Sequence, residues 1–303
     1  MKVRHFTKLW DLTKEEAITL IERALQFKRK KNWEKSLQGK ILALIFEKPS
    51  TRTRVSFEVA MSKLGGHSLF LSWQDLQLSR GEPIKDTARV LSRYVDGIVL
   101  RTYKQETIEE FSTYASVPVI NGLSDKFHPC QVMSDIMTII EKGKDLYKDK
   151  VLWFGDGNNV AQSWIEASAL LSFPLTICCP KGYEPNKDLL KEAKEKFKAQ
   201  IEIIYNPEVA LREAKIINTD VWVSMGQEIE KEERKRAFQE FTLDQEKLKL
   251  AHPEAIVLHC LPAYRGMEIT EEVLEGKQSV VWDQAENRMW FQMALLDFLM
   301  KNS

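Results

Sequence analysis

Short apolar runs alternate with amphipathic segments along most of the chain. Residues Ile41–Phe46 form a continuous apolar run, the pattern of a parallel strand that is buried on both faces. Earlier in the chain, Thr13 and Glu16 fit a capping box, and the apolar residues behind them recur at helical spacing, which predicts a helix over 13–29. The chain therefore opens with a helix followed by a buried strand.

The same alternation continues through both halves of the chain. In the first half we predict strands at 41–46, 68–72, 97–100 and 118–120, and helices after Pro49 through Leu64 and over 84–94, 106–115 and 129–141. In the second half we predict strands at 151–154, 175–179, 201–205, 216–223, 255–259 and 279–282, and a closing helix over 285–300. Such alternation indicates an α/β fold with two doubly wound parallel-sheet domains. The polar segment 141–150 marks the expected boundary between them.

Composition narrows the class of protein. A chain of 303 residues suits two domains, and 44% hydrophobic with 29% charged residues is typical of a globular protein. Lysine plus arginine (44) balance aspartate plus glutamate (44), so the overall charge gives no case for nucleic acid or an anionic membrane as a partner. The apolar runs are too short for a membrane span, and no signal-peptide core follows Met1, so we expect a cytoplasmic protein.

The four cysteines do not indicate a disulfide framework or a metal site. Cys130, Cys178, Cys179 and Cys260 form no C-x-x-C pair. His128 and His259 lie near two of them, but the spacing matches no zinc motif, so we expect no metal.

The residues with the clearest chemistry follow the first buried strand. In Ser50-Thr51-Arg52-Thr53-Arg54, two arginines and three hydroxyls stand where a helix begins, beside free backbone N–H groups and the positive end of the helix dipole. This pattern favours an oxyanion site suited to phosphate, whereas capping of the helix alone would explain one hydroxyl. The segment is not a P-loop, which disfavours nucleoside triphosphate hydrolysis.

Further polar residues follow other predicted strands, at the edge where open α/β sheets bind ligands. Arg101 ends one strand, and His128-Pro129-Cys130-Gln131 opens a helix, so that a histidine stands just before a helix N-terminus. Arg288 lies near the start of the closing helix. Taken singly, an arginine at a strand end such as Arg101 is more often a surface residue than a functional one. His128 fits a helix cap as well as it fits a hydrogen-bond donor to a ligand.

The second half carries three such segments. Gly155-Asp156-Gly157-Asn158-Asn159 resembles a dinucleotide-binding turn, but the next strand ends in Pro-Lys-Gly and not in an acidic residue, which weighs against an NAD-dependent dehydrogenase. Asp220, before Ser224-Met225-Gly226, suits a substrate ammonium group. Cys260, within His259-Cys260-Leu261-Pro262, fits either a nucleophile or a positioning thiol.

Together these segments resemble the ornithine carbamoyltransferase family, in the family's order and over nearly the whole chain from Phe6. Ser-Thr-Arg-Thr-Arg and His-Pro-Cys-Gln resemble its carbamoyl phosphate signature, and aspartate carbamoyltransferases share the former. Asp220 with Ser224-Met225-Gly226, and His-Cys-Leu-Pro, are the signals specific to the ornithine branch. The resemblance implies a carbamoyl-phosphate-binding domain over 1–147, joined by the C-terminal helix 286–303, and an ornithine-binding domain over 148–285.

The resemblance also implies roles for individual residues. The reaction transfers the carbamoyl group of carbamoyl phosphate to the δ-amine of L-ornithine, giving citrulline and phosphate, with no cofactor or metal. Arg101 and His128, with Thr53, Arg52 and Cys260, would be catalytic. Carbamoyl phosphate would bind Ser50, Thr51, Arg52, Thr53, Gln77, Arg101, His128, Pro129, Cys130, Gln131, Cys260, Leu261 and Arg288, and ornithine would bind Asn159, Asp220, Ser224, Met225 and Cys260.

The family also implies an assembly and a motion. Gln77 matches a loop residue that reaches into the site of a neighbouring subunit, which implies a homotrimer or a multiple of trimers, and Ser79 stands where the family commonly has glycine. Domain closure and movement of Ser224-Met225-Gly226 are expected to hold the two substrates together. The chemistry belongs to arginine metabolism, in synthesis or in breakdown.

Other functions remain to be weighed against this one. Aspartate, putrescine or an acylated ornithine are alternative acceptors, but Asp220 and Ser224-Met225-Gly226 form a handle for an α-amino acid with a free ammonium group. A non-catalytic binding protein on the same fold is the third alternative, because fold does not determine function. Such a protein should have lost Arg52, His128 or Cys260, and this chain keeps all three.

Overall fold

The computed structural model describes residues 3–30, 33–223 and 231–301. The chain forms two compact units, Met1–Met137 with Asn287–Ser303, and Thr138–Glu286. The expected boundary near residue 147 lies between α5 (Pro129–Glu141) and β5 (Lys150–Phe154), whereas the contacts divide the chain within α5. The second division falls between Glu286 and Asn287, and the expected C-terminal segment spans 286–303.

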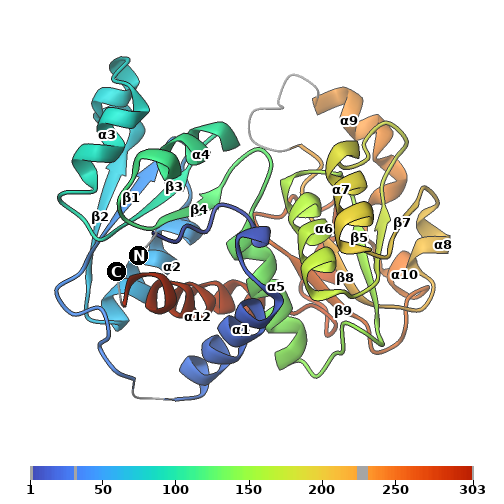
Figure 1. The fold of residues 1–303 in the computed structure, drawn as a ribbon. Coiled ribbons are helices and arrows are strands. Elements are labelled where there is room, and N and C mark those ends of the chain that lie inside the picture. The colour runs from blue at the N-terminus through green and yellow to red at the C-terminus, as the bar shows by residue number, and fades with distance from the viewer. Residues whose placement is uncertain (1–2, 31–32, 224–230, 302–303) are drawn as a thin grey trace. The chain divides into compact units, whose positions relative to one another are not determined.

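The first unit is built on a four-stranded parallel sheet in the order β2-β1-β3-β4 (Figure 1). Its strands are β1 (Ile41–Phe46), β2 (His67–Ser72), β3 (Gly97–Arg101) and β4 (Val119–Leu123). The central strand β1 is apolar on both faces because helices cover both. Phe46 pairs with Arg101 in register, so the segments that follow β1 and β3 leave the sheet side by side.

Helices cover the two faces of this sheet. Ala43 and Ile45 belong to a buried cluster with residues of α3 (Ile84–Leu91) and α4 (Gln105–Tyr114). The helix α2 (Thr51–Lys63) connects β1 to β2, and short 3-10 turns at Leu9–Asp11, Trp73–Asp75 and Gln77–Arg80 complete the unit. Because β1 and β2 are adjacent while β2 and β3 are separated by β1, the chain crosses over opposite faces of the sheet before and after β2.

The C-terminal helix α12 (Val281–Met300) returns to this first unit, as predicted. It lies beside α1 (Lys14–Arg29), and Lys28 Nζ donates to Asn287 Oδ1 at 2.8 Å (Figure 1). Gly97 lets the helix approach β3, because a Cβ atom there would lie 3.0 Å from the sulfur of Met300. The predicted capping box of α1 is confirmed, with the Thr13 side chain accepting from Glu16 N.

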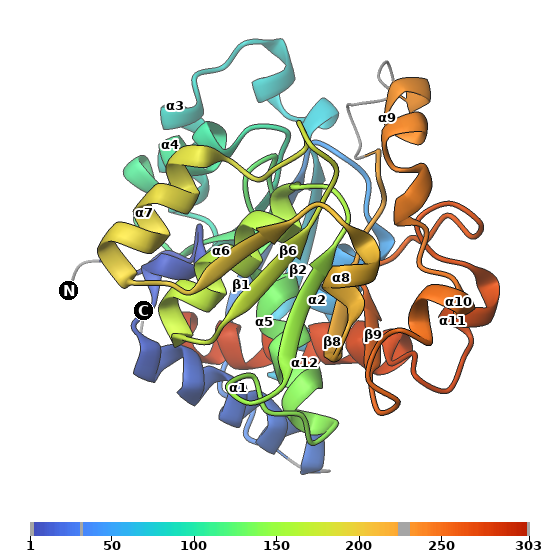
Figure 2. The same ribbon diagram turned by 90° about the vertical axis from the view of Figure 1, so that its right-hand side faces the viewer.

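The second unit is a five-stranded parallel sheet in the order β7-β6-β5-β8-β9. Its strands β6, β8 and β9 are labelled in Figure 2. The chain moves outward from β5 through α6 and α7 and returns through α8, so α6 and α7 cover one face of the sheet and α8 the other. The further strands are β6 (Leu175–Cys178), β7 (Ile201–Ile204), β8 (Ala214–Thr219) and β9 (Ile256–His259), and the helices are α6 (Asn159–Leu171), α7 (Lys187–Phe197), α8 (Pro207–Leu211), α9 (Lys231–Ala237), α10 (Gln245–Leu248) and α11 (Glu271–Leu274).

Two sequence predictions were wrong at element ends. The expected strand 279–282 is absent: Ser279 makes a single bridge to Val257, and α12 already begins at Val281. A short apolar run such as this has no periodicity that separates strand from helix. The expected strand 216–223 ends at Thr219, so that Asp220 is the first residue beyond β8.

No helix among the described residues is both long enough and apolar enough to cross a membrane. The two sheets with their covering helices confirm the predicted fold class.

Candidate functional site

The predicted oxyanion segment forms the first turn of α2. Ser50 is the N-cap, and its hydroxyl accepts a hydrogen bond from the Thr53 backbone N–H at 3.2 Å. The structure separates the two arginines. Arg54 forms an ion pair with Glu58, 3.0 Å apart, and its guanidinium lies 3.7 Å from the centre of the Phe70 ring. Arg52 and Thr51 are exposed beside the free N–H groups of the helix start, where an anion is favoured.

The Thr53 hydroxyl connects three parts of the sequence. Arg101 Nη1, at the end of β3, and Arg288 Nη2, in α12, each donate to Thr53 Oγ1 at 3.3 Å. Arg288 also donates to the Gln131 side-chain oxygen, while Gln131 Nε2 donates to Asp135 at 2.8 Å. The structure therefore brings Thr53, Arg101, Gln131 and Arg288 together, although Arg288 is far from the others in sequence.

His128 is the buried imidazole of this cluster. Burial lowers the pKa of His128 well below its usual range, and the positive charges of Arg288, Arg101 and Lys48 lower it further. The imidazole is therefore neutral at pH 7, and it can donate a hydrogen bond without carrying a charge. Concentrated positive charge around a neutral donor suits a ligand that brings negative charge of its own.

Lys48 was not predicted from the sequence. Its side chain is buried, with Nζ 4.4 Å from the centre of the Tyr103 ring. It lies between β1 and the N-cap Ser50, in the segment where a ligand was expected, so its position at the strand end was the available signal. A buried lysine there adds a positive charge to the cluster.

Pro129 and Cys130, the next two residues of the His-Pro-Cys-Gln motif, are part of the local structure at the start of α5. Pro129 is the first residue of α5, and its fixed backbone angle suits that position. Cys130 is fully buried, and its thiol donates to the Asn121 carbonyl at 3.5 Å. Burial raises the pKa of Cys130 to about 12, so its thiol stays protonated at neutral pH.

Gln77 begins the 3-10 turn Gln77–Arg80 and is exposed. Ser79, in the same turn, donates from its hydroxyl to the carbonyls of Leu76 at 2.8 Å and Gln74 at 3.1 Å. Glycine at position 79 would lack these bonds. The serine thus stabilises the turn that presents Gln77.

In the second unit, the turn after β5 holds an asparagine with a fixed orientation. Asn158 Oδ1 accepts from the backbone N–H groups of Val160 and Ala161 at 2.9 and 3.1 Å, which caps α6. Its Nδ2 group is therefore the donor, and it lies 2.7 Å from Asp220 Oδ2. The predicted Asn159 is the first residue of α6 and is partly exposed. The sequence pointed to this turn but not to Asn158 as the partner of Asp220.

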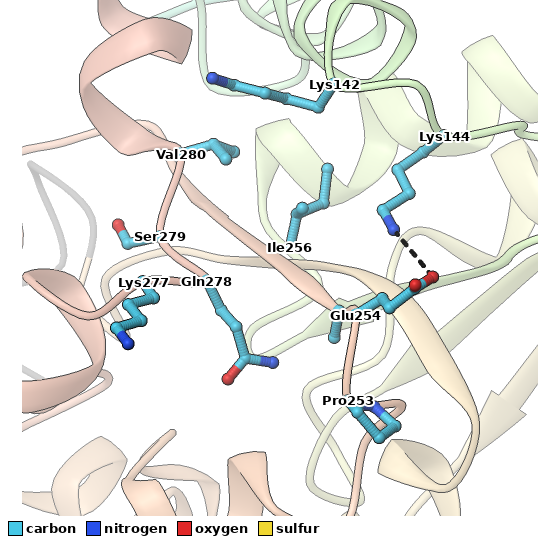
Figure 3. A pocket seen from close by; sticks show the side chains of 10 residues that line it. Lys142, Lys144, Pro253, Glu254, Ile256, Lys277, Gln278, Ser279 and Val280 are labelled. Atoms are coloured by element: carbon cyan, nitrogen blue, oxygen red, sulfur yellow. Dashed lines mark ion pairs between the residues drawn. The ribbon is translucent and has the colours of Figure 1, made fainter.

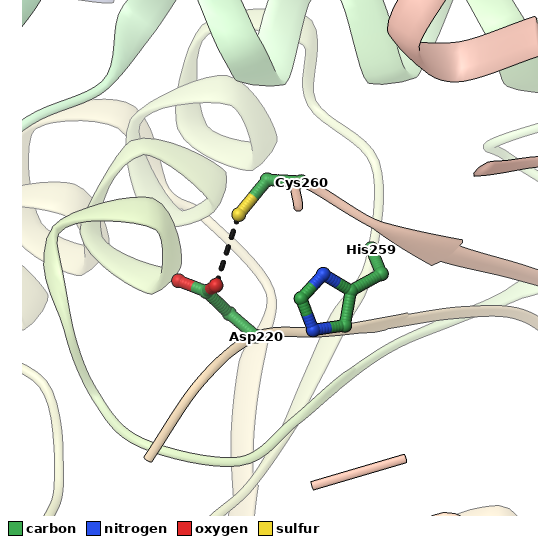
Figure 4. A group of neighbouring side chains, drawn as sticks. All are labelled: Asp220, His259 and Cys260. Atoms are coloured by element: carbon green, nitrogen blue, oxygen red, sulfur yellow. Dashed lines mark hydrogen bonds between the residues drawn. The ribbon is translucent and has the colours of Figure 1, made fainter. Parts of the chain in front are cut away.

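Asp220 and Cys260 are neighbours because Thr219 and His259, which precede them, pair in register at the ends of β8 and β9. The Cys260 thiol donates to Asp220 Oδ1 at 2.9 Å (Figure 4). Asp220 thus accepts one hydrogen bond on each carboxylate oxygen. The predicted Ser224 and Met225 lie outside the described residues.

A buried ion pair supports the same turn. Arg234 Nη1 donates to Asp156 at 2.9 Å and to the Trp222 carbonyl at 3.1 Å. Burial raises the pKa of Asp156 to about 6 in spite of the Arg234 charge, which acts in the opposite direction. Arg234 joins the segment after Asp220 to the turn after β5, a contact that no local sequence signal predicted.

A carboxylate oxygen, an imidazole nitrogen and the thiol of Asp220, His259 and Cys260 lie within 4.8 Å of one another. However, His259 Nδ1 accepts the Leu261 N–H at 2.9 Å, and Nε2 lies 3.0 Å from Glu268 Oε1. A metal ion would have to displace one of these hydrogen bonds. In this structure both ring nitrogens of His259 are engaged by protein groups.

A separate depression of about 440 Å³ lies at the opposite, amino-terminal end of β9 (Figure 3). Lys142, Lys144 and Lys277 line it, but Lys142 pairs with Asp283 at 2.6 Å and Lys144 lies 3.9 Å from Glu254. None of the predicted site residues lines it.

Known proteins match the chain over both units. Residues 4–141 match the carbamoyl-phosphate-binding domain, and residues 148–299 the Asp/Orn-binding domain, of aspartate/ornithine carbamoyltransferases. The ornithine carbamoyltransferase of Geobacter sulfurreducens is 53% identical over 302 residues, which cover 99% of this chain and 100% of that protein.

Solved structures also match the chain over nearly its whole length. The ornithine carbamoyltransferase from Pyrococcus furiosus has a TM-score of 0.93 at 49% identity, covering 98% of this chain and 97% of that one. The anabolic ornithine carbamoyltransferase from Campylobacter jejuni has a TM-score of 0.93 at 44% identity, covering 99% of this chain and 100% of that one.

Proposed function

This chain belongs to the aspartate/ornithine carbamoyltransferase family, and we propose that it transfers the carbamoyl group of carbamoyl phosphate to the δ-amine of L-ornithine. The products are L-citrulline and phosphate. The observation that carries the proposal is the convergence of Arg101 and Arg288 on the Thr53 hydroxyl beside a neutral, buried His128. The resemblance to the family inferred from the motifs is confirmed, and the chain is a carbamoyltransferase.

Carbamoyl phosphate binds through its charged phosphate end and its polar carbamoyl end. The phosphate lies at the start of α2, where Ser50, Thr51 and Arg52 join free backbone N–H groups. The carbamoyl oxygen accepts hydrogen bonds from Arg101, His128 and Thr53. A neutral His128 is suited to this task, because it donates to the oxygen while adding no further positive charge to a site already rich in it.

Ornithine binds through its α-amino acid group and its side-chain amine. Asp220 pairs with the α-ammonium group, while Asn159, Ser224 and Met225 hold the remainder of the amino acid. The fixed donors from Asn158 and Cys260 support this role, because they hold the Asp220 carboxylate in one orientation. Cys260 lies beside the δ-amine.

The reaction is an acyl transfer through a tetrahedral intermediate. The neutral δ-amine attacks the carbamoyl carbon and forms a C–N bond, and the carbonyl oxygen becomes negatively charged. The C–O bond to phosphate then breaks, and the amine proton leaves with the phosphate. Arg101, Thr53 and His128 stabilise the oxyanion, and each such donor contributes about a hundredfold or more in rate.

The enzyme acts as a homotrimer or a multiple of trimers, with Gln77 reaching a neighbouring subunit. The exposure of Gln77 in a turn stabilised by Ser79 supports this. It works in the cytoplasm, which the free thiols at all four cysteines support. Similarity to the anabolic Campylobacter jejuni enzyme supports a place in arginine biosynthesis.

Product analysis with separate acceptors tests the reaction. Citrulline should form from carbamoyl phosphate and ornithine, and no carbamoyl product should form from aspartate, putrescine or N-acetylornithine. Turnover with another amine would contradict the assigned role of Asp220.

Mixed oligomers test the role of Gln77. Gln77→Ala and Arg101→Ala should each be inactive alone, and mixing the two proteins after partial denaturation should restore some activity, because some shared sites then carry both native residues. If the mixture stays inactive although mixed oligomers form, Gln77 does not act across subunits.

A further inference from the structure

The imidazole of His259 is fully buried and hydrogen-bonded at both ring nitrogens. Its Nδ1 atom accepts the Leu261 backbone N–H at 2.9 Å, and its Nε2 atom lies 3.0 Å from Glu268 Oε1. Because Nδ1 accepts a backbone N–H, the ring proton lies on Nε2, which donates to the Glu268 carboxylate. The two partners therefore fix both the tautomer and the orientation of the ring.

The residue that His259 holds has an unfavourable backbone conformation. Leu261 has a φ angle of +56°, in the left-handed region that residues with a Cβ atom rarely adopt. Such a conformation persists only where the surroundings determine it. The hydrogen bond from Leu261 N–H to His259 is one such determinant.

Other buried side chains hold the same turn. Glu268 Oε1 also accepts the Tyr264 N–H at 2.7 Å, and Gln284 Oε1 accepts the backbone N–H of His259 at 2.8 Å. Glu268 and Gln284 are fully buried. The turn that begins at Cys260 is thus held by hydrogen bonds to the buried side chains of His259, Glu268 and Gln284.

We propose that His259 is a positioning residue for the proposed reaction. It holds the backbone of Leu261, and through it Cys260, where the substrates contact this turn, and it takes no proton during turnover. The inference rests on the proposed function for the identity of those substrates. The contact between Cys260 Sγ and Asp220, at 2.9 Å, is the geometry that this support maintains.

A role for His259 as the base that activates Cys260 or the amine is the alternative. The contacts disfavour it, because the ring has no lone pair left for a substrate proton: Nδ1 accepts from Leu261 and Nε2 donates to Glu268. The Cys260 thiol also donates to Asp220 and not to the imidazole.

Two amide variants of His259 test the contacts of its two ring nitrogens independently. The amide oxygen of His259→Asn takes the place of Nδ1 and keeps an acceptor for Leu261, whereas the amide of His259→Gln reaches toward Glu268 and leaves Leu261 N–H without its acceptor. Neither amide takes up a proton at neutral pH. We expect kcat/KM for citrulline formation to fall on the order of a hundredfold in His259→Gln, the cost of a misplaced group. His259→Asn should recover about tenfold of this loss, in line with one hydrogen bond.

The pattern of losses decides between the roles. Equal loss in both variants, with disappearance of one limb of the pH–rate profile, would show that His259 acts as a base and would overturn the proposal. A better-preserved His259→Gln would show that the Glu268 contact matters and the Leu261 contact does not, and it would also overturn the proposal. Glu268→Gln, which keeps an acceptor for Tyr264 N–H and for Nε2–H, should stay within about threefold of the native enzyme, less than the worth of one hydrogen bond.

Alkylation of Cys260 tests the positioning without any turnover. Cys260 is partly exposed, while Cys130, Cys178 and Cys179 are buried, so iodoacetamide labelling of the folded protein followed by peptide mass spectrometry reports on this turn. The labelling rate of Cys260 should change several-fold in His259→Gln and remain near native in His259→Asn. Identical rates in all three proteins would overturn the positioning role. If the native protein makes no citrulline, the proposed function fails, while the labelling rates still show whether His259 holds the turn.

Discussion

The thiol of Cys260 donates a hydrogen bond to the carboxylate of Asp220, with 2.9 Å between Sγ and Oδ1. This contact follows from the sheet, because the residues that precede the two pair in register on β8 and β9. It joins the two residues that mark the ornithine branch of the family. In the proposed function, Asp220 pairs with the acceptor's α-ammonium group and Cys260 lies beside its reacting amine.

Asp220→Asn should weaken ornithine binding. The variant loses the charge that we propose pairs with the α-ammonium group. A hydrogen bond to a charged group contributes about 1.5–3 kcal/mol, so kcat/KM for ornithine should fall by about ten- to a hundredfold. Steady-state kinetics with each substrate varied in turn measure this, and KM for carbamoyl phosphate should change little.

Cys260→Ser, which keeps a donor to Asp220, should retain more activity than Cys260→Ala. Equal activity in these two would mean that the hydrogen bond does not matter.

The two arginines of α2, Arg52 and Arg54, provide a test variant and a matched control variant. Arg52→Ala should lower kcat/KM by on the order of a hundredfold, because it removes a charge from the proposed phosphate site. Arg54→Ala should lose far less, because Arg54 pairs with Glu58 and lies over Phe70. Citrulline assays on the two purified variants, with circular dichroism as the control for folding, test this difference. A larger loss in Arg54→Ala would reverse the assignment of the phosphate ligand.

His128 should make stability depend on pH. Its folded pKa lies well below the value of about 6.5 expected in the unfolded chain. The unfolded state therefore gains a proton as pH falls through about 6.5, while the folded state does not. This contribution lowers the free energy of unfolding by up to about 1.4 kcal/mol per pH unit below 6.5.

Urea unfolding at pH 7.5 and pH 5.5 measures the effect of His128. The native protein should lose more stability between these pH values than His128→Asn, which cannot take up the proton. The same loss in both proteins would show that His128 is not held neutral by the fold.

Asp156 should act in the opposite direction. Its folded pKa is about 6, above the value of about 3.9 in the unfolded chain, so the folded state holds the extra proton between these values. The free energy of unfolding contributed by Asp156 therefore falls as pH rises from about 4 to about 6, by roughly 3 kcal/mol in all, and is constant above.

The variant Asp156→Asn removes this ionisation. Subtracting its unfolding free energy from that of the native protein at several pH values isolates the contribution of Asp156. A difference that rises with pH across this window would mean that the Arg234 charge outweighs burial.

Local sequence patterns were sufficient to predict much of the fold. The run Ile41–Phe46 gave β1 with its bounds, and the Thr13–Glu16 pair gave the start of α1, because apolar periodicity and helix capping depend on residues close in the chain. The polar residues at strand ends were also predictable as a group, because parallel strands present their carboxyl ends at one edge. The hydrogen-bond partners of these residues were not predictable from the sequence.

Tertiary structure alone decided which residues meet and what charge they carry. Thr53 receives hydrogen bonds from Arg101 and Arg288 because three separate segments pack together, and no periodicity records such a contact. Burial holds His128 neutral and raises the pKa of Asp156, and burial exists only once the chain has folded. The sequence by itself determined most of the strands and helices and the chemical groups at the sheet edges. The tertiary structure decided their partners and protonation, because both depend on packing between residues that are distant along the chain.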